Sequence, residues 1–175
     1  MMQGGWNQGV KYMIAASGIG ALLVLSALFL GHLSGRPLQT LSLVGSSVVL
    51  ECQPAAALVV ALRFPRFLGA LVVLLANLAP IPVIVVGLDL IVWHWPWAAR
   101  HVERANKRAG WVSRYGPLMF IPLCPALGAY ACVAIGKGLA FRPAWTLGAT
   151  VVGMMWSAVA IVYGGHWVIH LILGP

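Results

Sequence analysis

The feature of this sequence that most constrains its fold is a set of long apolar runs. Residues 13–33 contain no Asp, Glu, Lys or Arg, and about 20 apolar residues in a helix are enough to cross a bilayer. Four more runs follow, at 38–62, 67–97, 115–136 and 143–173. With 61% hydrophobic and 8% charged residues, the chain cannot cover the surface of a water-soluble fold. We therefore expect residues 1–175 to form a single all-α integral membrane domain.

Two of the five runs are interrupted near their centres. Glu51-Cys52-Gln53-Pro54 divides 38–62, and Pro117, Pro122 and Pro125 divide 115–136. A proline removes a backbone donor, and in lipid the freed backbone groups must find partners inside the protein. We expect both runs to be re-entrant (broken-helix) hairpins beside three crossing helices at 13–33, 67–97 and 143–173. The alternative is that both are kinked helices that span the membrane.

This layout predicts an orientation from the distribution of basic residues. If runs one, three and five cross, the 11 Lys and Arg residues divide eight to three between the two sides. Basic residues favour the cytoplasmic side. The N-terminus is then cytoplasmic and the C-terminus lies outside, and we expect the membrane to be a bacterial inner (cytoplasmic) membrane.

The same layout makes the two hairpins enter from opposite sides, which is the inverted repeat found in many secondary transporters. A short internal match accompanies it. Leu68-Gly69-Ala70 is repeated as Leu147-Gly148-Ala149, an offset of 79 residues.

The charged stretch 100–114 has helical spacing of its apolar residues, with Val102, Ala105, Ala109 and Val112 on one face. We interpret it as an amphipathic cytoplasmic helix on the membrane surface; the alternative is an ordinary basic loop. Five basic residues would then contact lipid headgroups: Arg100, Arg104, Lys107, Arg108 and Arg114. This placement explains the net charge of +8 without nucleic acid, so the expected partners are membrane lipids.

Glu51 is the strongest candidate for a functional residue. A charged carboxylate in the middle of an apolar run costs at least about 2.5 kcal/mol and is usually functional. Glu51 is therefore a candidate carrier of a proton or cation, with Gln53 and Cys124 lining the path beside it. The alternative is a neutral, hydrogen-bonded structural carboxyl group.

Three further charged residues are weaker candidates for ion coupling. Asp89 lies in an apolar run close to its end, where it is either solvated or paired with a cation such as Arg100. Arg63 and Arg142 would be inward-facing counter-charges for the two hairpins, or would simply mark helix ends.

Neither a metal site nor an enzyme is expected. The three cysteines form no Cys-x-x-Cys pair, and His166 and His170 stand beside Trp167 near the predicted outer interface. No nucleophile elbow, phosphate-binding loop or zinc-binding HExxH motif is present, and no cofactor is expected.

The order of several short motifs resembles the small multidrug export family, which is distantly similar to the DedA group. The matching pieces are LEC at 50–52, NLAPIP at 77–82, VERANKRAGWVSRYG at 102–116, IPL at 121–123, GAY at 128–130 and FR at 141–142. The resemblance implies a broken-helix membrane protein that carries out proton-coupled export or lipid translocation.

The sequence departs from the family pattern at both hairpins. Gln53-Pro54 replaces an Arg-Gly pair, and residues 124–130, CPALGAY, are one residue longer than the family's Gly-rich segment. These departures favour an alternative function as a non-transporting accessory or anchoring subunit of a larger membrane complex. Because three crossing helices make a thin barrier, we also expect a homo-oligomer or a larger assembly.

Overall fold

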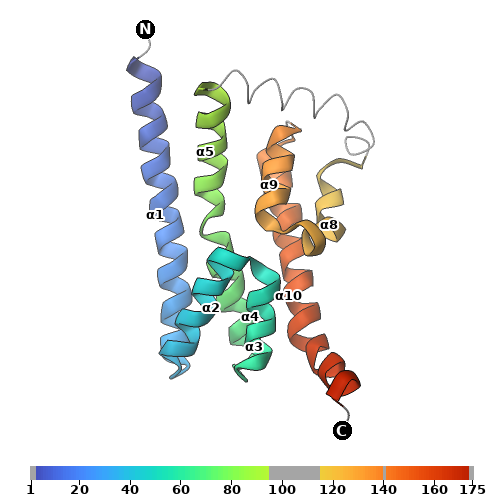
Figure 1. Ribbon diagram of the computed structural model, residues 1–175. Helices are drawn as coiled ribbons and strands as arrows, with labels where there is room; N and C mark the ends of the chain where they lie inside the picture. The colour runs from blue at the N-terminus through green and yellow to red at the C-terminus, as the bar shows by residue number, and fades with distance from the viewer. Residues whose placement is uncertain (1–2, 95–114, 140, 174–175) are drawn as a thin grey trace.

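The chain folds into helices of very different lengths (Figure 1). A computed structural model describes residues 3–94, 115–139 and 141–173, with side chains over 8–90, 115–139 and 141–164, so the stretch 100–114 lies outside the described residues. No strand occurs in the described parts. Within them, three helical segments are long and apolar enough to cross a membrane: Gln8–Leu33, Arg66–Leu90 and Pro143–Gly164. The expectation of an all-α protein with three such helices is confirmed.

The first half of the chain contains the first broken helix, made of α2 (Pro37–Leu50) and α3 (Cys52–Ala61). It follows the long helix α1 (Gln3–Leu33). Pro37 begins α2, where a missing N–H has no cost, and Pro54 lies in the first turn of α3. The interruption is therefore the single residue Glu51 rather than the whole Glu-Cys-Gln-Pro segment.

The third apolar run forms two stacked helices instead of one. They are α4 (Arg66–Leu78) and α5 (Ile81–His94), separated at Ala79 and Pro80. A proline at this point ends the hydrogen-bond ladder of α4 and then starts a new helix.

The second half repeats the order of elements. A short 3₁₀ turn, η1 (Gly116–Met119), leads into the second broken helix, α8 (Phe120–Leu127) and α9 (Ala129–Gly138), and then into α10 (Pro143–Leu173). The expected break at the prolines is wrong. Pro122 lies in the first turn of α8, where the backbone N–H is unpaired anyway, Pro125 is accommodated inside it, and the chain turns at Gly128, which has φ +83°.

The two broken helices approach each other from opposite ends of the bundle (Figure 1). The end of α2 and start of α3 point toward the middle from the end where α1 finishes. The end of α8 and start of α9 point toward the middle from the other end. The N- and C-termini of the chain also lie at opposite ends.

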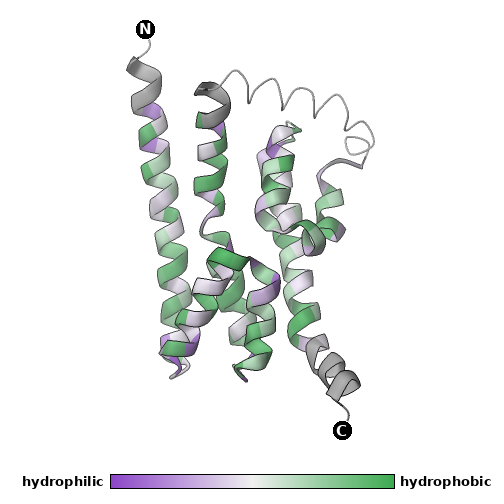
Figure 2. Ribbon diagram, in the orientation of Figure 1, coloured by the Kyte–Doolittle hydropathy of each residue, from purple (hydrophilic) through white to green (hydrophobic). Residues whose placement is uncertain are grey.

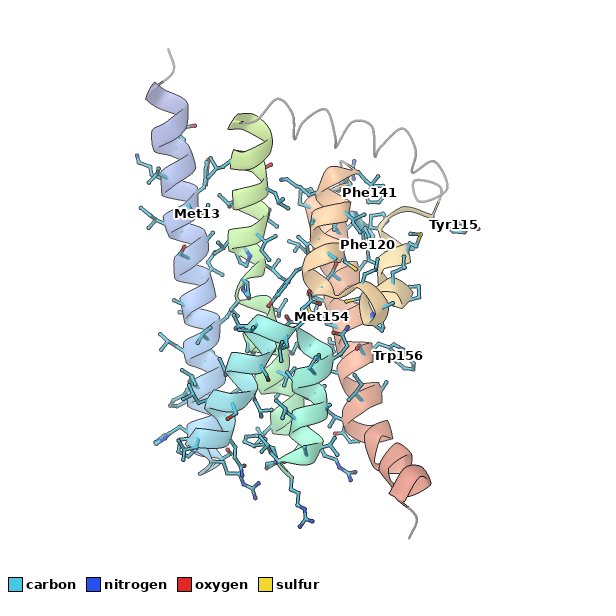
Figure 3. The ribbon with its side chains drawn as sticks, viewed as in Figure 1. Met13, Tyr115, Phe120, Phe141, Met154 and Trp156 are labelled. Carbon is cyan, nitrogen blue, oxygen red and sulfur yellow. The ribbon has the colours of Figure 1, made fainter. Side chains whose placement is uncertain are left out.

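The helices are apolar along most of their length (Figure 2), and many of their large apolar side chains are exposed, as on a surface that faces lipid. Leu38 is 80% exposed, Phe67 69% and Ile14 67%. Trp156 points away from the bundle (Figure 3). The interior is instead rich in small side chains, including the fully buried Ala55 and Ala76, which allow helix backbones to approach closely.

The buried faces of α3 and α9 coincide at a constant offset of 77 positions. The residues buried on α3 are Cys52, Ala55, Ala56 and Val59, and those on α9 are Ala129, Cys132, Val133 and Gly136. We call positions that differ by 77 equivalent. Backbone hydrogen bonds follow the same offset: Phe64 N–H donates to Val59 C=O, and Phe141 N–H to Gly136 C=O, each at 3.0 Å. The offset of 79 suggested by the Leu-Gly-Ala match does not describe this register.

Candidate functional site

The two broken helices are joined by reciprocal hydrogen bonds between equivalent residues. The side-chain amide of Gln53 donates from Nε2 to the carbonyl oxygens of Cys124 (3.0 Å) and Pro125 (3.2 Å). The hydroxyl of Tyr130 donates to the carbonyl oxygens of Ser47 (3.3 Å) and Val48 (3.2 Å). Adding 77 to 53, 47 and 48 gives 130, 124 and 125. Each half therefore binds carbonyl groups near the end of the first helix of the other half's broken helix, α2 or α8, which we call the incoming helix.

A second equivalent pair anchors each incoming helix to the long helix that follows it. The Ser47 hydroxyl on α2 donates to the carbonyl oxygen of Val73 on α4 at 2.8 Å. The Cys124 thiol on α8 donates to the carbonyl oxygen of Thr150 on α10 at 3.7 Å. Ser47 and Cys124 are both fully buried. The contact is the same in the two halves, with oxygen in one and sulfur in the other.

Glu51 and Gly128 occupy the two equivalent break points with nearly the same backbone conformation. Glu51 has φ +69° and ψ −172°, and Gly128 has φ +83° and ψ +162°. This region of backbone space is essentially restricted to glycine, and another residue there is strained by about 1–3 kcal/mol. Such strain persists only where the surrounding structure imposes it, and it occurs most often at functional sites.

The carboxylate of Glu51 lies directly against Gly128 of the second broken helix. A Cβ atom at Gly128 would overlap the carboxylate oxygens, so only glycine fits there. The backbone N–H groups of Ala129 and Tyr130 donate to the carboxylate. These are the first residues of α9, and the start of a helix favours a negative charge. The carboxylate of the first broken helix thus lies at the start of α9, the second helix of the other broken helix.

Behind this contact lies a buried group of polar and sulfur atoms. The Asn77 side chain donates from Nδ2 to Met154 Sδ at 3.1 Å, and the Cys52 thiol donates to the Met154 carbonyl oxygen at 3.9 Å. Asn77 and Met154 are equivalent residues, and Met154 lies near the middle of the bundle (Figure 3). Asn77 Oδ1 is buried without a hydrogen-bond partner among the described residues.

Phe120 and Arg36 each link the two ends of one broken helix, at the side away from the contact between the broken helices. Phe120 packs edge-on against Phe141, with ring centroids 6.2 Å apart (Figure 3). At the other end of the bundle, Arg36 Nη1 donates to the carbonyl oxygen of Arg63 at 2.8 Å. In each half, a residue at or just before the start of the incoming helix contacts the turn that follows the second helix, α3 or α9, which we call the returning helix.

The structure brings together three of the residues predicted from the sequence and separates the other three from them. Glu51, Gln53 and Cys124 all belong to the contact between the broken helices. Arg63 and Arg142 follow the far ends of α3 and α9, and both are exposed.

Asp89 forms an ion pair with Lys137 of α9, with Oδ2 and Nζ 2.8 Å apart. The suggested partner Arg100 lies outside the described residues, as do the other predicted headgroup contacts Arg104, Lys107, Arg108 and Arg114.

Gly128 and Tyr130, at the contact between the broken helices, are absent from the sequence-based candidates, and so is Lys137, the partner of Asp89. Gly128 and Tyr130 lie in the motif GAY, but only the 77-residue offset identifies them as equivalent to Glu51 and Gln53. Lys137 appears in the sequence as one more basic residue at a helix end, and its pairing with Asp89 depends on how α5 packs on α9.

No group of three or more His, Cys, Asp or Glu side chains in the described parts is arranged to hold a metal ion. A scan of the sequence against family models found no match, and searches of curated proteins and of solved structures found no significant relative.

Proposed function

We propose that this protein is a small secondary transporter in which Glu51 binds and releases a proton. The observation that carries the proposal is that Glu51 occupies a glycine-only backbone conformation at the contact between the broken helices. The equivalent position holds glycine, so the fold itself does not call for a side chain there. A carboxylate retained against that strain, in an apolar region, is best explained by a function of the carboxylate.

The chemistry of the contact favours a proton over a metal cation. The ionised carboxylate accepts hydrogen bonds from the N–H groups of Ala129 and Tyr130 at the start of α9. Those donors and the helix dipole oppose any added positive charge, but a proton, unlike a metal ion, needs no ligand other than the carboxylate itself. Protonation weakens the bonds to both N–H groups, and loss of the proton restores them. Glu51 would in this way couple a proton to the separation of the two broken helices.

We propose further that α2–α3 and α8–α9 are re-entrant hairpins of an inverted repeat, with the N-terminal end of the bundle in the cytoplasm. The reciprocal bonds of Gln53 and Tyr130 and the shared buried faces of α3 and α9 support this. In transporters of this design, alternating access arises when one repeat moves against the other around a fixed central site. The resemblance to the small multidrug export family suggests a lipophilic cargo or a membrane lipid.

The test is flux in liposomes that contain the purified protein, with a pH-sensitive dye inside and a panel of lipophilic cations and fluorescent phospholipids as cargo. We expect a flux driven by the pH gradient in the wild type and its loss in Glu51→Gln. The matched control is Glu103→Gln, in the charged segment between apolar runs, which should retain the flux.

Two outcomes would contradict the proposal. An unchanged flux in Glu51→Gln would remove the carboxylate from the mechanism. Absence of flux from a folded wild type across the whole panel would favour the accessory or anchoring subunit, and partner chains that co-purify with the protein would then be sought.

A further inference from the structure

We infer that the seam between α5 and α9, bridged by Asp89 and Lys137, is the gate through which Glu51 is reached from the N-terminal end of the bundle. The inference rests on the proposed function, because it concerns access to the proposed proton site. Neither Asp89 nor Lys137 takes part in the contact between the broken helices, and the ion pair would act as the latch of this gate.

Helix α9 connects the Glu51 carboxylate directly to the ion pair. Its first residues, Ala129 and Tyr130, donate to the Glu51 carboxylate, and Lys137 lies near its other end. A ten-residue helix (Ala129–Gly138) is a rigid rod about 15 Å long. When Lys137 is held by Asp89 at 2.8 Å, the start of α9 is held against Glu51. Release of Lys137 allows α9 to tilt away from α5 at the outer end.

The two equivalent seams differ at the position of the ion pair. In the first half, α3 packs on α10 in the way that α9 packs on α5. There the residue equivalent to Lys137 is Val60, and the residue equivalent to Val85 is Val162, which is fully buried. Val85 itself is only partly buried.

Beside Lys137, where α5 and α9 meet the start of α10, lies a cavity of about 10 Å³, lined by Val85, Val133, Phe141, Pro143, Thr146 and Leu147. That is close to the least volume that holds one water molecule. Val85, in the seam with the ion pair, is thus less completely buried than its equivalent Val162.

The strength of the ion pair suits a gate that opens and closes. The side chains of Lys137 and Asp89 are 29% and 60% exposed. Ion pairs with this degree of exposure are weak and are screened by salt. Such a pair biases the seam toward the closed state without locking it.

The test measures opening of the seam without relying on transport. Val133 lines the cavity and is 2% exposed, so Val133→Cys, in a protein whose three native cysteines are replaced, reports opening by its rate of reaction with neutral methyl methanethiosulfonate. We compare this rate, followed by mass spectrometry in nanodiscs, among Asp89→Asn, Lys137→Gln and the charge exchange Asp89→Lys with Lys137→Asp. The matched control is Lys11→Gln, a cation exposed near the same end of the bundle.

We expect each single variant to react roughly two- to fivefold faster than the parent, as loss of an exposed ion pair implies. The charge exchange and Lys11→Gln should react at the parent's rate. Equal rates in all proteins, or a charge exchange that stays as fast as the single variants, would overturn the gate. Equal rates together with a flux that depends on Glu51 would overturn the gate alone. Faster labelling in the single variants with no flux in any protein would show that the ion pair holds the seam closed and would reject the proton transport that the gate is inferred to serve.

Discussion

At the scale of single residues, Glu51 combines two requirements that oppose each other. Its backbone has φ +69°, which favours glycine, while its side chain supplies the carboxylate that contacts Gly128 and the start of α9. Natural proteins keep strained residues mainly where activity needs them. The stability and the activity of this protein should therefore respond in opposite directions to substitution at position 51.

Glu51→Gly tests this opposition. It relieves the backbone strain, whereas Glu51→Ala removes the carboxylate and keeps the strain. We expect Glu51→Gly to be more stable than Glu51→Ala by about 1–3 kcal/mol, and both to be inactive. Thermal unfolding in detergent, followed by circular dichroism, measures the difference. Equal stability of the two variants would show that the backbone at position 51 is not strained.

The candidate site was partly predictable at this scale. A lone carboxylate in the middle of an apolar run identifies Glu51 without any structure, because burial of a charge is costly. Gln53 follows from its proximity in sequence. Tyr130 does not, since a tyrosine in an apolar run is usually an interfacial or core residue. Its role depends on the carbonyl groups of Ser47 and Val48, which lie 83 and 82 residues earlier in the chain.

At the scale of elements, each returning helix (α3 or α9) meets the long helix that follows it at one close contact between a glycine and a larger residue. The glycine and the larger residue change places between the two halves. In the first half, Gly69 on α4 lies against Val59 on α3; in the second, Gly136 on α9 lies against Thr146 on α10. These are equivalent pairs, because 59 and 69 correspond to 136 and 146. The small residue is on the long helix in one half and on the returning helix in the other.

Gly69→Ala should therefore destabilise the protein by about 1–3 kcal/mol, as overpacking of a buried contact does. The companion substitution Val59→Gly places the glycine on the returning helix, as in the second half, and should recover most of that loss. A double-mutant cycle in thermal unfolding measures the coupling. Additive effects of the two substitutions would mean that the contact does not limit the approach of α3 and α4.

The lengths of the elements were easier to predict than their interruptions. An uncharged run of about 20 residues has few solutions other than a crossing helix, and α1 and α10 are continuous over the expected segments. The prolines of 115–136 were a misleading signal for the break, because Pro122 is accepted in the first turn of α8 and Pro125 is accommodated inside that helix. Gly128 gave no signal by itself, since glycine is frequent throughout the chain.

At the scale of the whole molecule, equivalence between the halves predicts which cysteines can be replaced. The positions equivalent to Cys52, Cys124 and Cys132 hold Ala129, Ser47 and Ala55, and all six residues are buried. We expect Cys52→Ala, Cys124→Ser and Cys132→Ala each to cost less than about 1.5 kcal/mol, and the triple variant to elute as a folded protein. Aggregation of Cys124→Ser alone would show that the Ser47 and Cys124 contacts are not interchangeable.

The reciprocal bonds also have a consequence for biosynthesis. Glu51 leaves the ribosome 77 residues before Gly128, so at about 5–20 residues per second its carboxylate waits roughly 4–15 s for the N–H groups of Ala129 and Tyr130. During that interval the carbonyl groups of Ser47 and Val48 also lack the Tyr130 hydroxyl that later binds them. The first broken helix therefore lacks both sets of partners until the second one has been synthesised.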